Sequence, residues 1–150
     1  MIVERVIDQK AREIKQWPVR SNRASSLGHP CTRYLTFERT HWQEKVLHGP
    51  SLQMVFDIGN DVEDRVLRDL REAGFTVIEQ QRAFEWAKYG ITGHIDAKIQ
   101  IGSTVYPIEV KSMSPFVFDK TNTVADMLNS KYHYMRSYPA QMTLYLLMDN

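Results

Sequence analysis

The feature that most constrains this chain is a change in hydrophobic period at Gly74. Before it, apolar residues recur three and four positions apart, which is typical of amphipathic helices, in three segments: 3–17, 31–47 and 51–74. After it, apolar and polar residues alternate along 75–86 and 91–101, as in strands that have one face in a core. The sequence therefore predicts helices followed by a sheet.

The strands are expected to form an antiparallel three-stranded meander. The segment 87–90, "AKYG", joins the first two strands, and "GS" turns the chain into a third strand, "TVYPIEVK", at 104–111. Two helical stretches follow, near "TVADMLN" and in "YPAQMTLYLLM", where Pro139 is expected in the first turn. This order predicts an α/β fold of the mixed α+β kind, with a central mixed sheet flanked by helices.

Length and charge indicate one domain with a basic amino-terminal part. A chain of 150 residues with 43% hydrophobic and 25% charged residues has the composition of a single globular domain, 1–150. The helical part, 1–50, holds nine Lys and Arg against five Asp and Glu, whereas 51–150 holds ten against thirteen. A polyanionic partner would suit this imbalance, although a solvated basic face explains it equally simply.

The cysteine count bears on the compartment. Cys31 is the single cysteine, which excludes an internal disulfide, and neither terminus shows a signal peptide or an apolar run of about 18 residues. We therefore expect a reduced, cytoplasmic setting and no membrane partner.

Three charged residues interrupt the predicted meander. Glu109 and Lys111 are two positions apart on one strand and project from the same face, and Asp96 lies on the polar face of the neighbouring strand. Two carboxylates suit a hard divalent cation such as Mg²⁺, and a lysine beside them can orient an attacking water molecule. The alternative is an ordinary cross-strand ion pair between Lys111 and Asp96.

Polar residues also interrupt the apolar faces of two predicted helices. Glu63 falls on the apolar stripe of 51–74, where a buried carboxylate needs a cation, unless it is a boundary residue that reaches solvent. Gln141 and Tyr145 are four positions apart and share one face of the last helix. Buried polar groups need hydrogen-bond partners, which an ionised site would supply; a backbone group and the surface would serve equally well.

Together these segments resemble a known family. "GHIDAKI" followed by "PIEVKS" resembles the core motif of the PD-(D/E)XK nucleases. "FDIGNDVEDRVLRDLREAG" and "YPAQMTLYLLM" resemble the helical motifs of the RecB-like exonuclease branch, which includes CRISPR-associated and phage recombination exonucleases. The resemblance covers about residues 25–148 and implies a restriction-endonuclease-like core, with 51–150 as the catalytic part.

The resemblance implies a role for each charged residue of these motifs. Asp96 and Glu109 correspond to metal ligands, and Val110 lends its carbonyl oxygen. Lys111 corresponds to the catalytic lysine. Glu63 corresponds to the acidic residue of the helix before the sheet, and we expect it to be a further ligand of the metal.

The same resemblance implies substrate contacts. Gln141 and Tyr145 match the Q-x-x-x-Y motif, which is expected to line the site and to position the substrate strand. The early "SSLGHPCTRY" resembles a Ser/Cys/Arg segment of several members, so Ser26 and Arg33, with Arg23 just before them, are expected to contact nucleic acid. Apart from the resemblance, "KYHYMRSY" mixes aromatic with basic residues, and Lys131 and Arg136 are expected contacts there, with plain packing of the tyrosines as the alternative.

The expected activity is hydrolysis of DNA phosphodiester bonds with Mg²⁺ or Mn²⁺, by an exonuclease of recombination, repair or phage replication. DNA is the expected partner, and a homo-oligomer or a recombination partner protein stays open. An iron–sulfur cluster of the kind some members carry needs four cysteines, so none is expected within this chain. Two alternatives stay open: a non-catalytic nucleic-acid-binding or assembly module on the same scaffold, and a structure-specific or restriction endonuclease.

The last residues bear on completeness. The fold implied by the resemblance adds a strand after the Gln/Tyr helix, whereas the sequence stops at "LLMDN". We therefore expect a fragment of a longer protein, with the final core strand missing.

Overall fold

A computed structural model describes residues 1–149 and shows a mixed α+β fold. The helices are α1 (Ile2–Glu13), α2 (Thr32–Thr40), α3 (Pro50–Glu72), α4 (Pro115–Phe118), α5 (Val124–Leu128) and α6 (His133–Met148). The strands are β1 (Asn22–Arg23), β2 (Thr76–Ile78), β3 (Arg82–Trp86), β4 (Ile91–Ile95), β5 (Ala97–Ile101) and β6 (Thr104–Ile108). Single turns of 3₁₀-helix are η1 (Ala24–Ser26), η2 (Trp42–Glu44) and η3 (Ala87–Tyr89).

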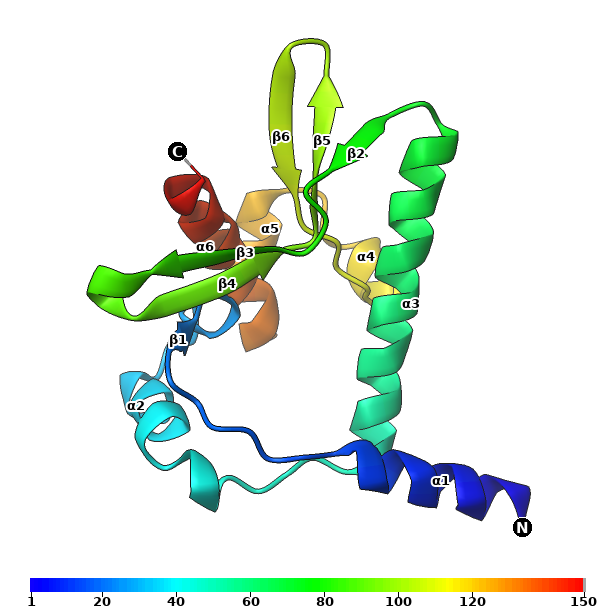
Figure 1. The fold of residues 1–150 in the computed structure, drawn as a ribbon, viewed down its shortest axis with the longest axis vertical. Helices are drawn as coiled ribbons and strands as arrows, with labels where there is room; N and C mark the ends of the chain where they lie inside the picture. The colour runs from blue at the N-terminus through cyan, green and yellow to red at the C-terminus, as the bar shows by residue number, and fades with distance from the viewer. Residues whose placement is uncertain (150) are drawn as a thin grey trace.

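The strands form two small sheets of three strands each (Figure 1). One has the order β1-β4-β3, in which β3 and β4 are antiparallel and β1 joins β4 in parallel. The other has the order β2-β5-β6 and is antiparallel throughout. The predicted pairing around 87–90 and the turn at 102–103 are therefore confirmed, whereas a single central sheet is not what forms.

The two long predicted strands each break where the sheets meet. The break in 75–86 includes Glu79 and Gln81, whose φ values are 49° and 53°, a conformation incompatible with a continuous strand. The break in 91–101 is at Asp96, whose backbone carbonyl accepts a hydrogen bond of 2.9 Å from the Gln81 N–H. One two-stranded ribbon thus bends into two sheets, and Asp96 lies at the bend.

The helices differ from their predicted bounds mainly at their ends. The helix expected at 3–17 ends at Glu13, and the one expected at 31–47 is α2 followed by the separate turn η2. The third ends as predicted, because Gly74 adopts a φ of 89° that favours glycine. Helix α6 begins at His133, so Pro139 lies inside the helix and not in its first turn.

A small core joins the amino-terminal part to the last helix. Its buried members are Ala24 from η1, Phe84 from β3, Ile95 from β4 and Tyr145 from α6. The rings of Phe84 and Tyr145 are stacked, with centroids 6.1 Å apart. The basic segment 1–50 therefore contributes a strand and a core residue to the sheet on which α6 packs.

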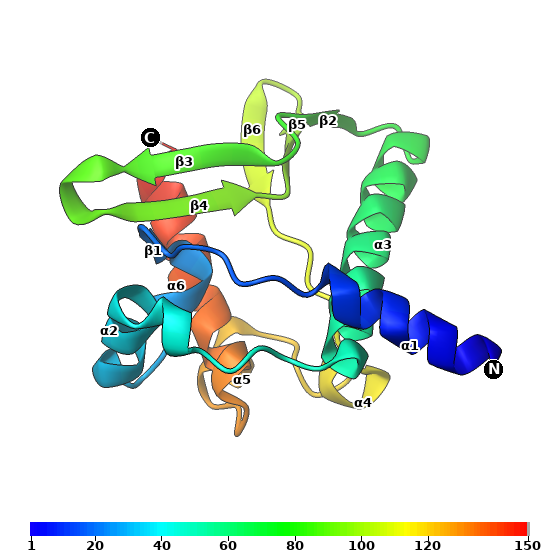
Figure 2. The same ribbon diagram turned by 60° about the horizontal axis from the view of Figure 1, so that its bottom comes forward.

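The remaining helices surround this core unevenly. Figure 2 shows α6 beside β1, β3 and β4, while α3 stands on the far side of the molecule with α1 across its first turns. Within residues 1–149, no helix is both long and apolar enough to span a membrane.

Candidate active site

The bend between the two sheets places Asp96 against the segment that follows β6. One of its carboxylate oxygens, Oδ2, accepts a hydrogen bond of 2.6 Å from the backbone N–H of Val110. Because the Asp96 backbone is also bonded to Gln81, this side chain is held from two directions. The geometry therefore joins Asp96 directly to the segment that carries Glu109 and Lys111.

Glu109 is the centre of a hydrogen-bonded group. Its Oε1 atom accepts from Lys111 Nζ at 2.5 Å and from Gln141 Nε2 at 2.6 Å, and its side chain is only 6% exposed. Strand β6 ends at Ile108, so the prediction of a strand through Lys111 is wrong. Glu109 and Lys111 nevertheless point to one side, since their side chains contact each other.

The last helix supplies the neutral members of the group. Gln141 and Tyr145 are both buried, and Gln141 Nε2 also lies 3.0 Å from the Tyr145 hydroxyl oxygen, to which it donates. Tyr145 fits because Gly93 faces it: a Cβ at this position would lie 2.5 Å from Tyr145 Cε1. The polar face predicted for this helix is therefore turned toward the two carboxylates.

Glu63 reaches the group through an amide. Gln81 Nε2 donates to Glu63 Oε1 at 2.5 Å, and the Gln81 backbone N–H donates to the Asp96 backbone carbonyl at 2.9 Å. We call Asp96, Glu109, Lys111, Gln141 and Tyr145 the carboxylate site, with Glu63 attached to it through Gln81. The structure thus brings all the residues expected to be catalytic or metal-binding, Val110 included, into one connected network.

The surroundings of the carboxylate site disfavour the ionised form of its acidic groups. Burial raises the pKa of Glu109, and the nearby Asp96 raises it further, although Lys111 and Gln141 act in the opposite direction. Burial likewise raises the pKa of Asp96, against the effects of the Val110 N–H and Lys111. Burial also raises the pKa of Glu63. The site therefore concentrates more buried negative charge than Lys111 offsets.

Such a site suits a hard divalent cation. Glu109 Oε2 is buried and, among residues 1–149, accepts no hydrogen bond, so this oxygen lacks a partner that a buried charged atom requires. Carboxylate and carbonyl oxygens are the ligands that Mg²⁺ and Mn²⁺ favour. The residues that would hold the cation are Asp96, Glu109 and Val110. In the described part of the chain, no group of three or more His, Cys, Asp or Glu side chains is arranged so that it could hold a metal ion by itself.

The sequence does not predict two residues that contact the site, Gln81 and Tyr138. Gln81 falls inside a segment that alternates like a strand, so nothing in the pattern marks it as the link between Glu63 and Asp96. Tyr138 had a usable signal, because it lies three positions before Gln141 on the same helix face. Lys111 Nζ lies 5.1 Å from the centroid of the Tyr138 ring, a cation–π contact.

The residues expected to contact nucleic acid are dispersed. Arg23 is exposed on β1, Ser26 ends η1, and both line a cavity beside α2. Arg33 lies over the Phe37 ring, at 5.3 Å from its centroid. The remaining two lie near the start of α6, where Lys131 is over the Tyr132 ring and Arg136 donates to the Ser130 carbonyl at 2.5 Å.

The chain matches no protein-family model, no curated protein and no solved structure.

Proposed function

We propose that this chain is a metal-dependent nuclease that hydrolyses DNA phosphodiester bonds, with an exonuclease of recombination or repair as its closest functional type. The observation that carries the proposal is the unbroken contact from Asp96 through Val110 and Glu109 to Lys111, with Gln141 on the other side of Glu109. A buried carboxylate at Glu109, a half-buried one at Asp96 and a lysine held this way are costly for stability and useful for catalysis at a phosphate. A restriction-endonuclease-like core is part of the proposal.

The proposed reaction assigns each residue a task. Asp96, Glu109 and the Val110 carbonyl would hold a divalent cation, which supplies charge stabilisation at the phosphate and a lower pKa for a bound water. The Lys111 ammonium orients the attacking water toward phosphorus. Gln141 fixes the Glu109 carboxylate, and Tyr145 fixes Gln141. Water gives up one proton to solvent as its oxygen bonds to phosphorus, the P–O bond to the departing sugar oxygen breaks in line, and that oxygen takes up one proton from solvent.

The test is cleavage of end-labelled linear DNA and closed circular DNA in Mg²⁺, in Mn²⁺ and in EDTA. We expect loss of the linear substrate alone, only with metal, and about 10³-fold slower cleavage by Lys111→Met, since positioned charge and proton-transfer groups each contribute about 10²–10⁴-fold. Lys88→Met, which changes an exposed lysine on η3, is the matched control. Equal rates for wild type and Lys111→Met would refute the mechanism.

A further inference from the structure

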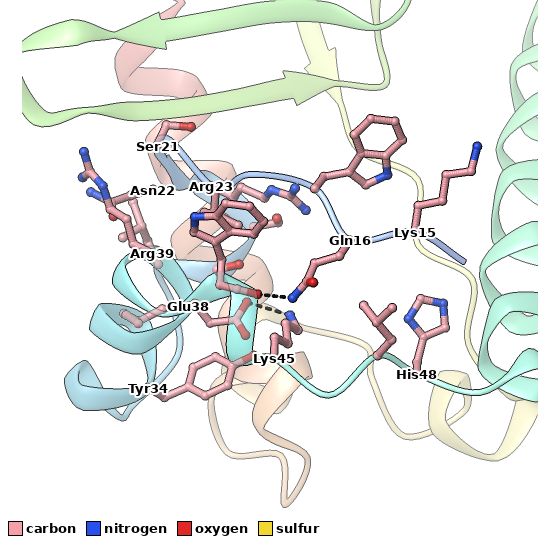
Figure 3. A pocket seen from close by; sticks show the side chains of 18 residues that line it. Lys15, Gln16, Ser21, Asn22, Arg23, Tyr34, Glu38, Arg39, Lys45 and His48 are labelled. Atoms are coloured by element: carbon pink, nitrogen blue, oxygen red, sulfur yellow. Dashed lines mark hydrogen bonds and ion pairs between the residues drawn. The ribbon is translucent and has the colours of Figure 1, made fainter. Parts of the chain in front are cut away.

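A concave region lies outside the carboxylate site. It is a cavity of about 390 Å³ between the segment 15–19, β1 with η1, and α2 with η2 (Figure 3). Pockets that take small organic ligands begin at about this size. None of the five members of the carboxylate site lines this cavity, so the two regions are distinct.

The cavity carries surplus positive charge. Lys15, Arg23 and Arg39 line it and, in the part of the chain that the structure describes, none of them forms an ion pair. The acidic residue in the wall, Glu38, is already paired with Lys45 at 2.8 Å. Figure 3 shows Arg39 on one side, Lys15 on the other and Arg23 between them. Cations spread in this way suit successive phosphates better than a single phosphate group.

Aromatic side chains accompany these cations. Trp17 is 66% exposed and is not part of the core. Trp42 is half-buried, and its backbone carbonyl accepts a hydrogen bond of 2.5 Å from Gln16 Nε2. Tyr34 is also in the wall, 43% exposed and stacked on His29. Exposed aromatic faces beside cations are the elements that bind single-stranded nucleic acid, because every base offers a face for stacking.

The cavity adjoins the carboxylate site through one layer of residues. Arg23 and Ser25 line the cavity, whereas Ala24 between them is fully buried in the core with Tyr145. Tyr145 in turn accepts from Gln141, which bonds Glu109. A strand bound in the cavity would therefore lie on the opposite side of η1 from the carboxylates.

We propose that this cavity binds a short single-stranded segment of nucleic acid, with bases stacked on Trp42 and Trp17 and phosphates paired with Lys15, Arg23 and Arg39. The inference rests on the proposed function and deepens it, because a nuclease needs a strand-binding region next to its carboxylate site. It assigns binding roles to Trp17, Trp42, Lys15 and Arg39. It also commits the substrate to a single strand, whereas a duplex would keep its bases stacked on one another.

The test is binding of a fluorescent oligothymidylate of twelve nucleotides, followed by anisotropy in EDTA so that no cleavage occurs. We expect Trp42→Leu to weaken binding about tenfold, because stacking of one base contributes about that much, and Trp42→Phe to restore most of it. Arg39→Gln should lower the slope of log K against log salt by about 0.7, the value for one lost phosphate contact on a single strand. Arg68→Gln, an exposed arginine on α3, should change neither quantity.

Two further arms distinguish the ligand. A duplex of the same length should bind more weakly than the single strand, and free dTMP should compete poorly, since it offers one phosphate and one base. Equal binding of duplex and single strand, efficient competition by dTMP, or unchanged affinity in Trp42→Leu would overturn the inference. Because these measurements need no metal, binding without any Mg²⁺-dependent cleavage would refute the proposed nuclease while leaving this inference standing.

Discussion

The carboxylate site and the cavity beside η1 hold their charges in opposite ways. In the carboxylate site, Glu109 is 6% exposed and is bonded to Lys111 and Gln141, so its position is fixed by neighbours. In the cavity, Arg39 and Trp17 are exposed, and Trp17 lies beyond Glu13, where α1 ends. Fixed, buried charge suits chemistry at one atom, whereas exposed and unpaired charge suits a long ligand that is itself charged.

The two regions also differ in what they cost the fold. Burial raises the pKa values of Asp96 and Glu109, which means that their ionised forms are held at the expense of folding stability. Solvated cations in the cavity carry almost no such penalty. The comparison therefore predicts that changes in the carboxylate site alter turnover and stability, and that changes in the cavity alter affinity.

The largest effect that separates the two regions should come from Gln141→Leu. This change removes the donor that fixes the Glu109 carboxylate, and loss of such a supporting contact lowers activity by about 10- to 100-fold. We expect turnover to fall toward the upper end of that range while KM and the affinity for oligothymidylate change little. Steady-state kinetics and anisotropy on the same protein measure this.

Gln9→Leu on α1 is the control, because its amide bonds only the exposed Glu13. A fall in oligothymidylate affinity equal to the fall in turnover would contradict the separation, since it would make the two regions one binding site.

A smaller effect is expected where the two regions share a contact, at Gly93. A Cβ there would lie 2.5 Å from Tyr145 Cε1 and 3.1 Å from Ala24 Cβ, so Gly93→Ala presses on the carboxylate site directly and on the cavity through Ala24, whose neighbours Arg23 and Ser25 line it. Overpacking of this kind costs about 2 kcal/mol in the free energy of unfolding. The urea midpoint should fall, and both turnover and oligothymidylate affinity should fall with it.

Gly59→Ala provides the matched control for this substitution. Gly59 lies inside α3, where an added Cβ would be 3.7 Å from Ser112 Oγ, an ordinary contact. Alanine is favoured over glycine in a helix interior, so this variant should be slightly more stable than wild type. If Gly93→Ala unfolds at the same urea concentration as wild type, the close approach of Tyr145 to β4 is wrong.

The sequence predicts much of the carboxylate site because its residues follow regular periods. Gln141 and Tyr145 are four positions apart on α6, and that spacing alone places them on one side of the helix. Glu109 and Lys111 are two positions apart and also lie on one side, although β6 ends before them at Ile108. The order of helices before and after the strands also follows from periodicity. The sequence predicts that the residues of the carboxylate site meet at Asp96 only through the family resemblance. Spacing within one element cannot show that residues from three different elements lie together.

The bend at Asp96 is not predictable from the same pattern. The alternation continues through 91–101 without a proline, and its one glycine, Gly93, lies three positions before the bend, so a single strand is the natural prediction. What breaks it is tertiary: the Gln81 N–H bonds the Asp96 carbonyl, and the Val110 N–H bonds its carboxylate. A hydrogen bond between distant segments leaves no period in the sequence.

The cavity is hidden for a different reason. Trp17 counts as part of the apolar face of the helix expected at 3–17, and Trp42 as part of the one expected at 31–47. The structure ends those helices at Glu13 and Thr40, which leaves Trp17 outside any helix and puts Trp42 at the start of the separate turn η2. Helix ends are set by local hydrogen bonding, which hydrophobic periodicity reports poorly, so the aromatic wall emerges only in three dimensions.

The smallest effect, and the one that tests the carboxylate site without catalysis, is stabilisation by a divalent cation. In the protein alone, the raised pKa values of Asp96 and Glu109 mean that their stabilising contribution is present below their ordinary values of 3.8 and 4.5 and is lost as the pH rises through the raised ones. At pH 8 the ionised pair therefore destabilises the fold, and a bound cation offsets this.

A cation at ten times its dissociation constant should add about 1.4 kcal/mol to the free energy of unfolding. Thermal unfolding in Mn²⁺ against EDTA should show a shift of about 4 °C at pH 8, and a smaller one at pH 5. Asp96→Asn keeps an oxygen for the Val110 N–H but loses a charge, so its shift should nearly vanish; an equal shift in wild type and variant would place the cation elsewhere.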